Sequence, residues 1–265
     1  MTEKLTPTLR PETAFRRIAA GCAAAFADHL AQVMASDDPE GPHKARVALR
    51  RFRSALTGFA PVIDPAARRE MAGQARELFR ALGRLRDADV LLAGCLDPTA
   101  VAGLAADADR IRSEVRAEMV SMQAADYAGA LTLRLESKDW LRQDKRGKRW
   151  HRRGLPRLAR RALDRAWEAC LAHGTSLADL APETRHELRK ELKTLRYLSE
   201  YFAPFWPGPK QDRFLAHLRA LQESLGTLND QTLAPVPPEP AVMATLLTNA
   251  AKALKALVKD GPWWS

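Results

Sequence analysis

Two groups of basic residues in this chain repeat the same residue types at the same spacing. The first group is His43, Arg46, Arg50 and Arg53, and the second is His186, Arg189, Lys193 and Arg196. In each group the residues stand at i, i+3, i+7 and i+10, which places all four on one stripe of a helix and spans roughly 15 Å. Guanidinium, ammonium and imidazolium groups in a row bind anions, so the spacing predicts two helices that present cations to a polyanion. We call these groups the first ladder and the second ladder.

The two ladders belong to an internal duplication with an offset of 143 residues. Aligned without a gap, residues 43–87 and 186–230 are identical at 13 of 45 positions. The identity continues beyond the ladders, where Arg76 matches Arg219 and where the motif LGxLxD ends at Asp87 in one copy and at Asp230 in the other. Two unrelated amphipathic helices would share Leu and Arg without keeping one register for so long, so the sequence indicates two copies of one unit.

The opposite face of each ladder helix is apolar. The apolar positions are Leu49, Phe52, Ala55 and Leu56 in the first copy, and Leu188, Leu192, Leu195 and Leu198 in the second. Each ladder helix is therefore expected to bury one face in a core and to present its cations on another. Like charges three or four residues apart repel by a few tenths of a kcal/mol, roughly. A row without alternating signs predicts an anionic ligand that neutralises it.

The composition supports an anionic partner. The 265 residues include 42 Lys+Arg against 32 Asp+Glu, for a net charge of +10, which does not choose among nucleic acid, a membrane surface and polyphosphate. Three widely spaced cysteines indicate neither a disulfide framework nor a zinc site. No signal-peptide core and no uncharged apolar run of about 18 residues is recognisable, so we expect a soluble intracellular protein without a membrane partner.

Helical periodicity predicts an all-α fold, because short runs with strand periodicity are absent. In the first half, the predicted helices are residues 11–34, the first ladder, residues 66–82, residues 90–96, residues 98–122 and residues 127–141. Pro11 opens the first of them. Gly83 is predicted to interrupt the chain between the third and fourth.

The second half begins after a strongly basic stretch. Residues 142–161 hold ten Lys/Arg and His151, and Gly147 and Gly154 break their periodicity, so a hinge between the halves is expected there. A new helix with a basic face begins at Pro156, as the counterpart of the helix that carries Arg16 and Arg17. The elements predicted after it are a loop at 173–181, the second ladder helix from residue 182, a helix at 210–225, a turn at 226–230, a Pro-rich loop at 234–240, a last helix at 241–259 and a tail whose Trp263 and Trp264 pack back on the bundle.

The paired motifs HxxRxxxRRxR and HxxRxxxKxxRY, each followed by LGxLxD, resemble those of the CHAD domain, the "conserved histidine α-helical domain". The resemblance covers residues 11–259 and implies a single CHAD domain over residues 1–265, with an N-terminal half at 10–141 and a C-terminal half at 154–260. It implies two pseudo-symmetric, four-helix-bundle-like halves that face one another across a basic channel and bind inorganic polyphosphate. It also implies a stand-alone domain, since the glutamate-bearing strands of an accompanying triphosphatase domain are not recognisable.

The resemblance assigns polyphosphate binding to the ladder residues and to nearby cations. These are His43, Arg46, Arg50, Arg51, Arg53, Arg76, His186, Arg189, Lys190, Lys193, Arg196, Arg219, Arg17, Arg157, Arg160 and Arg161. Lys193-Thr194 in place of Arg50-Arg51, and Asn229 in place of Arg86, predict a weaker grip by the second ladder. Each ladder histidine is expected near a helix start, where the helix dipole favours anions and a bound phosphate would raise its pKa.

The two motif aspartates, Asp87 and Asp230, are interpreted as structural. An acid, a base or a metal ligand is conceivable there, but the setting favours capping of the next helix or bracing of a ladder arginine. The remaining histidines show no ligand spacing and stay unassigned; they are His29, His151, His173 and His217.

The sequence is compatible with three functions. The leading hypothesis is a non-enzymatic polyphosphate-binding module, because a ligand without bases needs only cations. The alternative is a nucleic-acid (RNA) binding module, which generally uses stacked aromatic residues, whereas the ladders contain only Phe52 and Tyr197. A phosphoryl-transfer enzyme normally needs metal-binding carboxylates beside the cations, and the ladder faces have none. We expect no cofactor, no metal, and a cytoplasmic location with association with polyphosphate granules through the ligand.

Overall fold

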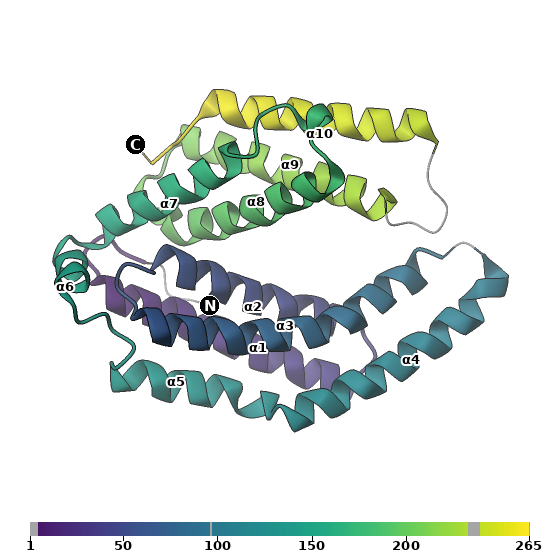
Figure 1. Cartoon of the computed structure of the whole chain (residues 1–265), viewed down its shortest axis with the longest axis horizontal. Helices are drawn as coiled ribbons and strands as arrows, with labels where there is room; N and C mark the ends of the chain where they lie inside the picture. Colours follow the sequence, from purple (N-terminus) through teal and green to yellow (C-terminus); the bar gives the residue numbers. More distant parts are fainter. Residues whose placement is uncertain (1–4, 96, 233–238, 265) are drawn as a thin grey trace. The chain divides into compact units, whose positions relative to one another are not determined.

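The computed structural model describes residues 5–95, 97–232 and 239–264, and over these residues it consists of helices (Figure 1). The predicted all-α class is confirmed. The α-helices are α1 Pro11–Ala35, α2 Glu40–Gly58, α3 Pro65–Ala93, α4 Pro98–Ser121, α5 Tyr127–Ser137, α6 Lys145–Arg152, α7 Leu155–Leu171, α8 Pro182–Phe202, α9 Pro209–Thr232 and α10 Pro240–Asp260. Short 3₁₀ helices occur at η1 Ala124–Asp126, η2 Leu177–Asp179 and η3 Ala203–Phe205. The chain divides into two compact units, which we call unit 1 (residues 10–153) and unit 2 (residues 154–264 with residues 5–9).

Unit 1 is built on α1, α2 and α3, which pack side by side in chain order, with α4 against α3 and α5 against α1. Phe15 of α1 is at the centre of an aromatic cluster. Its ring centroid lies 6.4 Å from that of Phe52, 5.6 Å from that of Phe59 and 5.1 Å from that of Trp140. All four side chains are buried. Because buried aromatic residues contribute much of a core's stabilisation, this cluster fixes the apolar face of α2 in the core.

Unit 2 packs α7, α8, α9 and α10 in chain order. Phe214 of α9 lies between two tryptophans, with its ring centroid 5.7 Å from that of Trp167 in α7 and 5.5 Å from that of Trp264 in the C-terminal tail. The indole Nε1 of Trp264 donates a hydrogen bond of 2.8 Å to Asp164 Oδ1. The prediction that the tail tryptophans pack back on the bundle is confirmed, since both Trp263 and Trp264 are buried.

The prediction that Gly83 interrupts a helix is wrong, and so is the turn predicted at residues 226–230. The helix α3 runs from Pro65 to Ala93 without a break, and α9 runs through Gly226 to Thr232. A glycine inside a helix lowers helix stability by about 1 kcal/mol, which does not end a helix of this length when its neighbours pack well. Asp87 therefore lies in the interior of α3 and caps no following helix.

Three other boundaries differ from the sequence predictions. The helix α2 begins at Glu40, three residues before the first ladder residue His43, and the predicted loop at 173–181 contains η2. The helix predicted at residues 127–141 ends earlier, because Lys138 adopts a left-handed conformation with φ 60° after Ser137. Trp140 then packs from the non-helical link, where its carbonyl accepts a 2.7 Å hydrogen bond from Asp64 N. Residues 145–152 of the expected hinge form α6. Residues 234–238 of the predicted Pro-rich loop lie outside the described residues.

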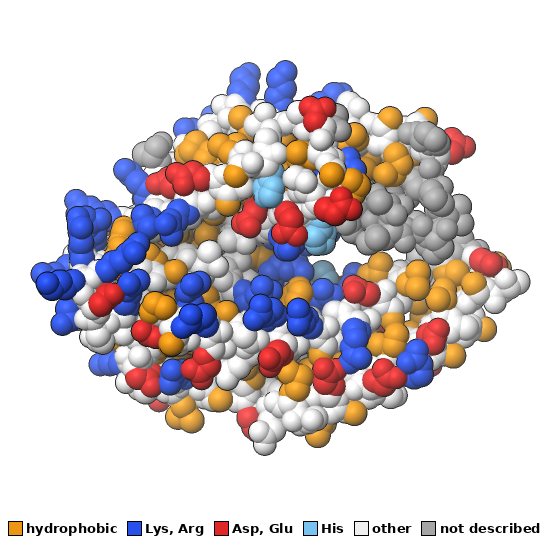
Figure 2. Space-filling model, in the orientation of Figure 1, with side chains coloured by type: hydrophobic (Ala, Val, Ile, Leu, Met, Phe, Trp, Pro, Cys, Tyr) orange, Lys and Arg blue, Asp and Glu red, His pale blue; other side chains and the backbone are white. Residues whose placement is uncertain are grey.

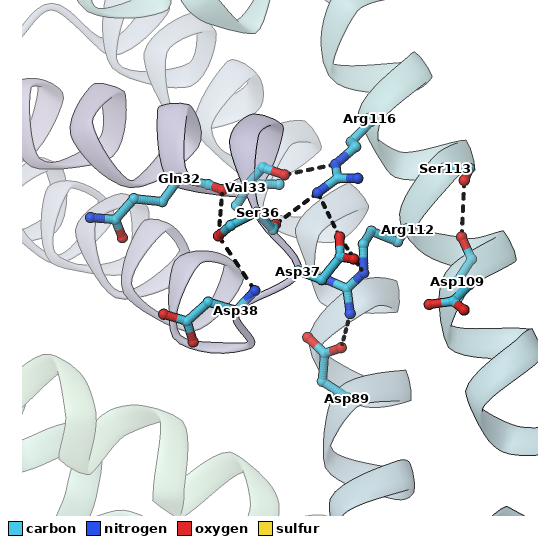
Figure 3. A network of polar contacts seen from close by, with 10 residues as sticks. All are labelled: Gln32, Val33, Ser36, Asp37, Asp38, Asp89, Asp109, Arg112, Ser113 and Arg116. Carbon is cyan, nitrogen blue, oxygen red and sulfur yellow. Dashed lines mark hydrogen bonds and ion pairs between the residues drawn. The ribbon is translucent and has the colours of Figure 1, made fainter. Parts of the chain in front are cut away.

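Two arginines of α4 fasten this helix to the rest of unit 1 (Figure 3). Arg112 is buried, and its Nη2 donates a 2.8 Å hydrogen bond to Asp89 Oδ1 of α3. Arg116 donates to Val33 O at 2.8 Å, to Ser36 O at 2.7 Å and to Asp37 Oδ1 at 2.9 Å, so it closes the end of α1. Loss of one partner of the buried pair Arg112–Asp89 would destabilise the fold strongly, because the remaining charge would be buried without a partner.

Two helices are long and apolar enough to cross a membrane by length and composition alone. They are α1 and residues 241–260 of α10, each with an 18-residue window of mean hydropathy 1.3. Core helices of water-soluble proteins meet the same criterion, and α1 packs into unit 1 through Phe15, Ile18 and Phe26, which are all buried. This observation is therefore weak evidence for a membrane span.

Candidate anion-binding ladders on α2 and α8

The first ladder lies on a different face of α2 from the residues buried in the core, as predicted. The opposite face is buried, with Leu49, Phe52, Ala55 and Leu56 each at most 2% exposed. The corresponding leucines of α8 are at most 1% exposed. Each ladder helix thus has one face fixed in its own unit's core and its cations on another face.

The sixteen predicted binding residues fall into two classes of exposure. The half-buried ones are Arg17, Arg46, Arg50, Arg51, Arg53, Arg161, Arg189, Lys193 and Arg196. The exposed ones are His43, Arg76, Arg157, Arg160, His186, Lys190 and Arg219. Long cationic side chains that are half-buried rest their stems on the protein and keep their charged ends near water, which suits a fixed binding surface.

Arg46 is held by the motif that follows the ladder. A Cβ atom at Gly83 of α3 would lie 3.6 Å from the guanidinium carbon of Arg46, so this group packs over the glycine at an ordinary contact distance. Arg46 Nη1 donates a 3.4 Å hydrogen bond to Gly83 O and lies 3.5 Å from Asp87 Oδ1. The alternative that Asp87 braces a ladder arginine is therefore confirmed. Asp87 is largely exposed, so the ion pair orients Arg46 more than it stabilises the fold.

Phe79 of α3 supports three ladder arginines and was not predicted from the sequence. The guanidinium carbons of Arg46, Arg50 and Arg53 lie 4.5, 5.1 and 5.8 Å from the centroid of its ring. Cations within about 6 Å of a ring are attracted by its quadrupole. The position escapes the repeat comparison because its counterpart in unit 2 is Gln222.

Positive charge is concentrated around the first ladder. Partial burial lowers the pKa of His43, and the nearby Arg86 lowers it further, while Glu40 acts in the opposite direction. Burial also lowers the pKa of Arg53, and the neighbouring Arg76 adds to the effect. The guanidinium groups remain charged at any physiological pH, so a bound anion would reduce the repulsion among them.

The second ladder repeats part of this geometry. A Cβ atom at Gly226 of α9 would lie 3.5 Å from Nη2 of Arg189, which matches the approach of Arg46 to Gly83. The buried Gln222 donates a 2.6 Å hydrogen bond from Nε2 to Leu192 O and so offers no ring to the cations. The side chain of Asp230 lies outside the described residues, so its predicted role stays a prediction.

Two cations of the second ladder region contact carboxylates. Arg196 Nε lies 3.5 Å from Glu200 Oε1, and its guanidinium carbon is 4.9 Å from the ring centroid of Tyr197. Lys190 Nζ lies 2.8 Å from Glu187. The first ladder's Arg50 and Arg53 contact no carboxylate in this way within the described part of the chain, which makes the electrostatics of the two ladders unequal.

The first helices of the two units match with an offset of 144, one more than the ladders. The buried positions of α7 are Leu155, Leu158, Ala159, Ala162, Leu163, Ala166, Trp167 and Cys170, and those of α1 at this offset are Pro11, Ala14, Phe15, Ile18, Ala19, Cys22, Ala23 and Phe26. The offset pairs Arg17 with Arg161 and Arg16 with Arg160. The expectation that α7 is the counterpart of α1 is therefore supported by the burial pattern.

Comparison with known proteins places these features in a family. The family model for the CHAD domain matches residues 17–235. This chain belongs to the CHAD domain family. The crystal structure of the CHAD domain from the plant Ricinus communis is similar, with 24% identity, a TM-score of 0.70, and coverage of 99% of this chain and 91% of that chain. PptA from Streptomyces chartreusis shares 14% identity at a TM-score of 0.52, with 96% of each chain covered. No match to a curated protein was found.

The position of the ladders within this CHAD domain is now defined for each unit separately. In unit 1, α2 carries the ladder and α3 supplies Gly83, Phe79 and Asp87. In unit 2, α8 carries the ladder and α9 supplies Gly226. The implied channel shared by both ladders stays a prediction.

Proposed function

We propose that this CHAD domain binds inorganic polyphosphate, without enzymatic activity, along the ladders of α2 and α8. The observation that carries the proposal is the repeated support of a ladder arginine by the next helix. A Cβ atom at Gly83 would lie 3.6 Å from Cζ of Arg46, and a Cβ atom at Gly226 would lie 3.5 Å from Nη2 of Arg189, so each arginine packs over a glycine of the following helix. A duplicated arrangement that holds guanidinium groups in fixed rows suits a ligand with regularly repeated negative charges.

The geometry favours polyphosphate over RNA. Single-stranded nucleic acids are generally held by aromatic rings on which bases stack. Phe79 is already approached by three guanidinium groups, and Phe52 and Tyr197 are buried. The ladders therefore offer cations and no free aromatic surface, which a ligand without bases requires.

The geometry also supports a binding role rather than phosphoryl transfer. Such chemistry normally places metal-bound carboxylates beside the transferred group. Among the residues that the structure describes, no cluster of three or more His, Cys, Asp or Glu side chains could hold a metal ion. The carboxylate that contacts the first ladder, Asp87, pairs with Arg46.

Competition binding tests the proposal. Labelled long-chain polyphosphate bound to the protein should be displaced by unlabelled polyphosphate at lower concentrations than by RNA of equal charge. Both competitors are measured at one fixed salt concentration, because each affinity depends on salt. Replacing Arg46 and Arg53 together by alanine should weaken long-chain binding far more than replacing the exposed Lys252 and Lys255 of α10. Equal losses in the two double variants, or tighter binding of RNA, would contradict the proposal.

The family resemblance further implies that one long chain contacts both ladders. A ligand held at two places gains effective concentration at the second, whereas triphosphate reaches one place only. We therefore expect calorimetry to give one long chain per protein. Two independent long-chain sites per protein would show that the ladders act separately.

A further inference from the structure

The helix α6 presents a second row of cations in unit 1. Its eight residues contain no acidic side chain, and Lys145, Lys148, Arg149 and Arg152 stand at i, i+3, i+4 and i+7. All four are exposed, and they share one stripe of the helix. Figure 2 shows Lys and Arg side chains gathered over α6. The predicted hinge is thus a helix with a cationic face.

The start of α6 is rigidly built. Asp144 caps the helix by accepting a 2.7 Å hydrogen bond from Gly147 N, and it also accepts bonds from Nε and Nη2 of Arg142. The hydrogen bonds from Arg142 are the main cause that lowers the pKa of Asp144 to about 2, so the cap stays ionised. A Cβ atom at Gly147 would lie 2.1 Å from Arg142 O, which only glycine avoids.

The opposite face of α6 is fastened to unit 1. Trp150 is buried, and the guanidinium carbon of Arg153 lies 5.0 Å from its ring centroid. His151 Nδ1 lies 3.1 Å from Glu12 Oε2, near the start of α1. These contacts leave the cationic stripe as the face of α6 that is directed to solvent.

The fastening places α6 near the Arg53 end of the first ladder. Phe15, one turn after Glu12 in α1, packs on Phe59, which follows the last residue of α2. The backbone N of Arg142 donates a 3.0 Å hydrogen bond to Val62 O, just beyond α2. The segment leading into α6 and the start of α1 therefore both adjoin the C-terminal end of the ladder helix.

No carboxylate neutralises this stripe within the described part of the chain, because none of its four cations forms an ion pair or a side-chain hydrogen bond there. Four like charges on two helical turns repel one another. We propose that α6 is an extension of the first ladder's binding surface and holds the part of a long polyphosphate chain that continues beyond Arg53. This inference rests on the proposed function and adds a determinant of chain-length preference.

The chemistry of α6 favours polyphosphate over the other polyanions. Its one aromatic residue, Trp150, is buried, so no ring is available for base stacking. Membrane-surface helices present large apolar side chains beside their cations, and the exposed residues of α6 are Lys and Arg. The stripe therefore offers charge without a stacking or an insertion surface.

The test compares two sets of three neutralising substitutions in the full chain. The first set is Lys148→Gln, Arg149→Gln and Arg152→Gln on α6. The matched control set is Lys252→Gln, Lys255→Gln and Lys259→Gln on α10, which removes the same charge from exposed lysines. Glutamine keeps a good helix propensity, and circular dichroism checks that both variants fold. Dissociation constants are measured for long polyphosphate, triphosphate, an RNA oligomer and vesicles containing phosphatidylserine.

The α6 set should weaken long-chain binding by about tenfold, since three exposed ionic contacts are lost. The salt dependence of log K should become shallower by about 2 if three contacts release counterions as on a single-stranded polyanion. Triphosphate binding should stay unchanged, and the control set should behave as the unaltered protein.

Several results would overturn the role of α6. They are an equal loss in the control set, an equal loss of triphosphate binding, or a loss confined to RNA or to vesicles. If the α6 set binds normally while Arg46→Ala with Arg53→Ala does not, the proposed function stands and the extension is wrong. If the unaltered protein fails to bind polyphosphate, both proposals fall.

Discussion

Replacing Phe79 by leucine should weaken polyphosphate binding without unfolding the protein. Three guanidinium carbons lie within 5.8 Å of this ring, and a cation–ring contact that water still reaches contributes about 0.5–1 kcal/mol. The cations also repel one another, so we count two contacts rather than three and expect a loss of about 1–2 kcal/mol. That corresponds to a dissociation constant roughly 5 to 30 times higher.

The physical reason is preorganisation. Without the ring, Arg46, Arg50 and Arg53 move apart to reduce their repulsion, and a bound chain has to bring them together again. Leucine keeps most of the apolar volume, so it removes the ring's charge distribution more than its packing.

Calorimetry with long polyphosphate measures the loss, and Phe79→Tyr is the matched control because it keeps an aromatic ring. Tyrosine should retain nearly all of the affinity. Equal affinity in the leucine and tyrosine variants would refute the role of the ring. The role of the ring would also be refuted if the leucine variant melted at so low a temperature that its unfolded fraction explained the loss of binding.

Three further predictions follow from the same geometry. Arg50→Glu combined with Lys193→Glu should abolish polyphosphate binding while helical circular dichroism is kept, because both side chains lie on the half-exposed ladder faces; loss of fold would show that the ladders are structural. The pKa of His43 is lowered in the free protein, and a bound phosphate raises it, so binding takes up a proton. The affinity for polyphosphate should therefore increase as the pH falls from about 8 to about 5. Binding titrations over these pH values should show a smaller increase for His43→Gln. Gly83→Ala should raise the melting temperature by a few degrees, since the helix gains about 0.5–1 kcal/mol and the new Cβ meets Arg46 at 3.6 Å, an ordinary contact distance; destabilisation would mean that the glycine is needed for the backbone.

Much of the fold could be predicted because the repeat and the helical periodicity carry the same information. The ladder helices and their buried apolar faces follow from spacing, and the packing of the two tail tryptophans on the bundle was also predicted. The error at Gly83 arose because glycine was interpreted by its backbone freedom, whereas this glycine lies inside a continuous helix and Arg46 packs over it.

The parts that the sequence did not predict depend on contacts between elements. Phe79 is not repeated, so the comparison of the two copies could not select it, and its role appears only when α3 packs on α2. The helix α6 was not predicted, because Gly147 was interpreted as a break in the helical periodicity. In the structure this glycine permits close contact with the backbone of Arg142.

The attachment of α4 has a consequence for how unit 1 fluctuates. All its buried residues, namely Ala108, Arg112, Val115 and Met119, lie beyond its tenth residue, as does the anchoring Arg116. The first ten residues of α4 have none, so their hydrogen bonds can open without breaking the core. Amide hydrogen exchange should therefore be fast from residue 98 to about residue 107 and slow from Arg112 onward, within one continuous helix. Uniform protection along α4 would show that its first half has another support.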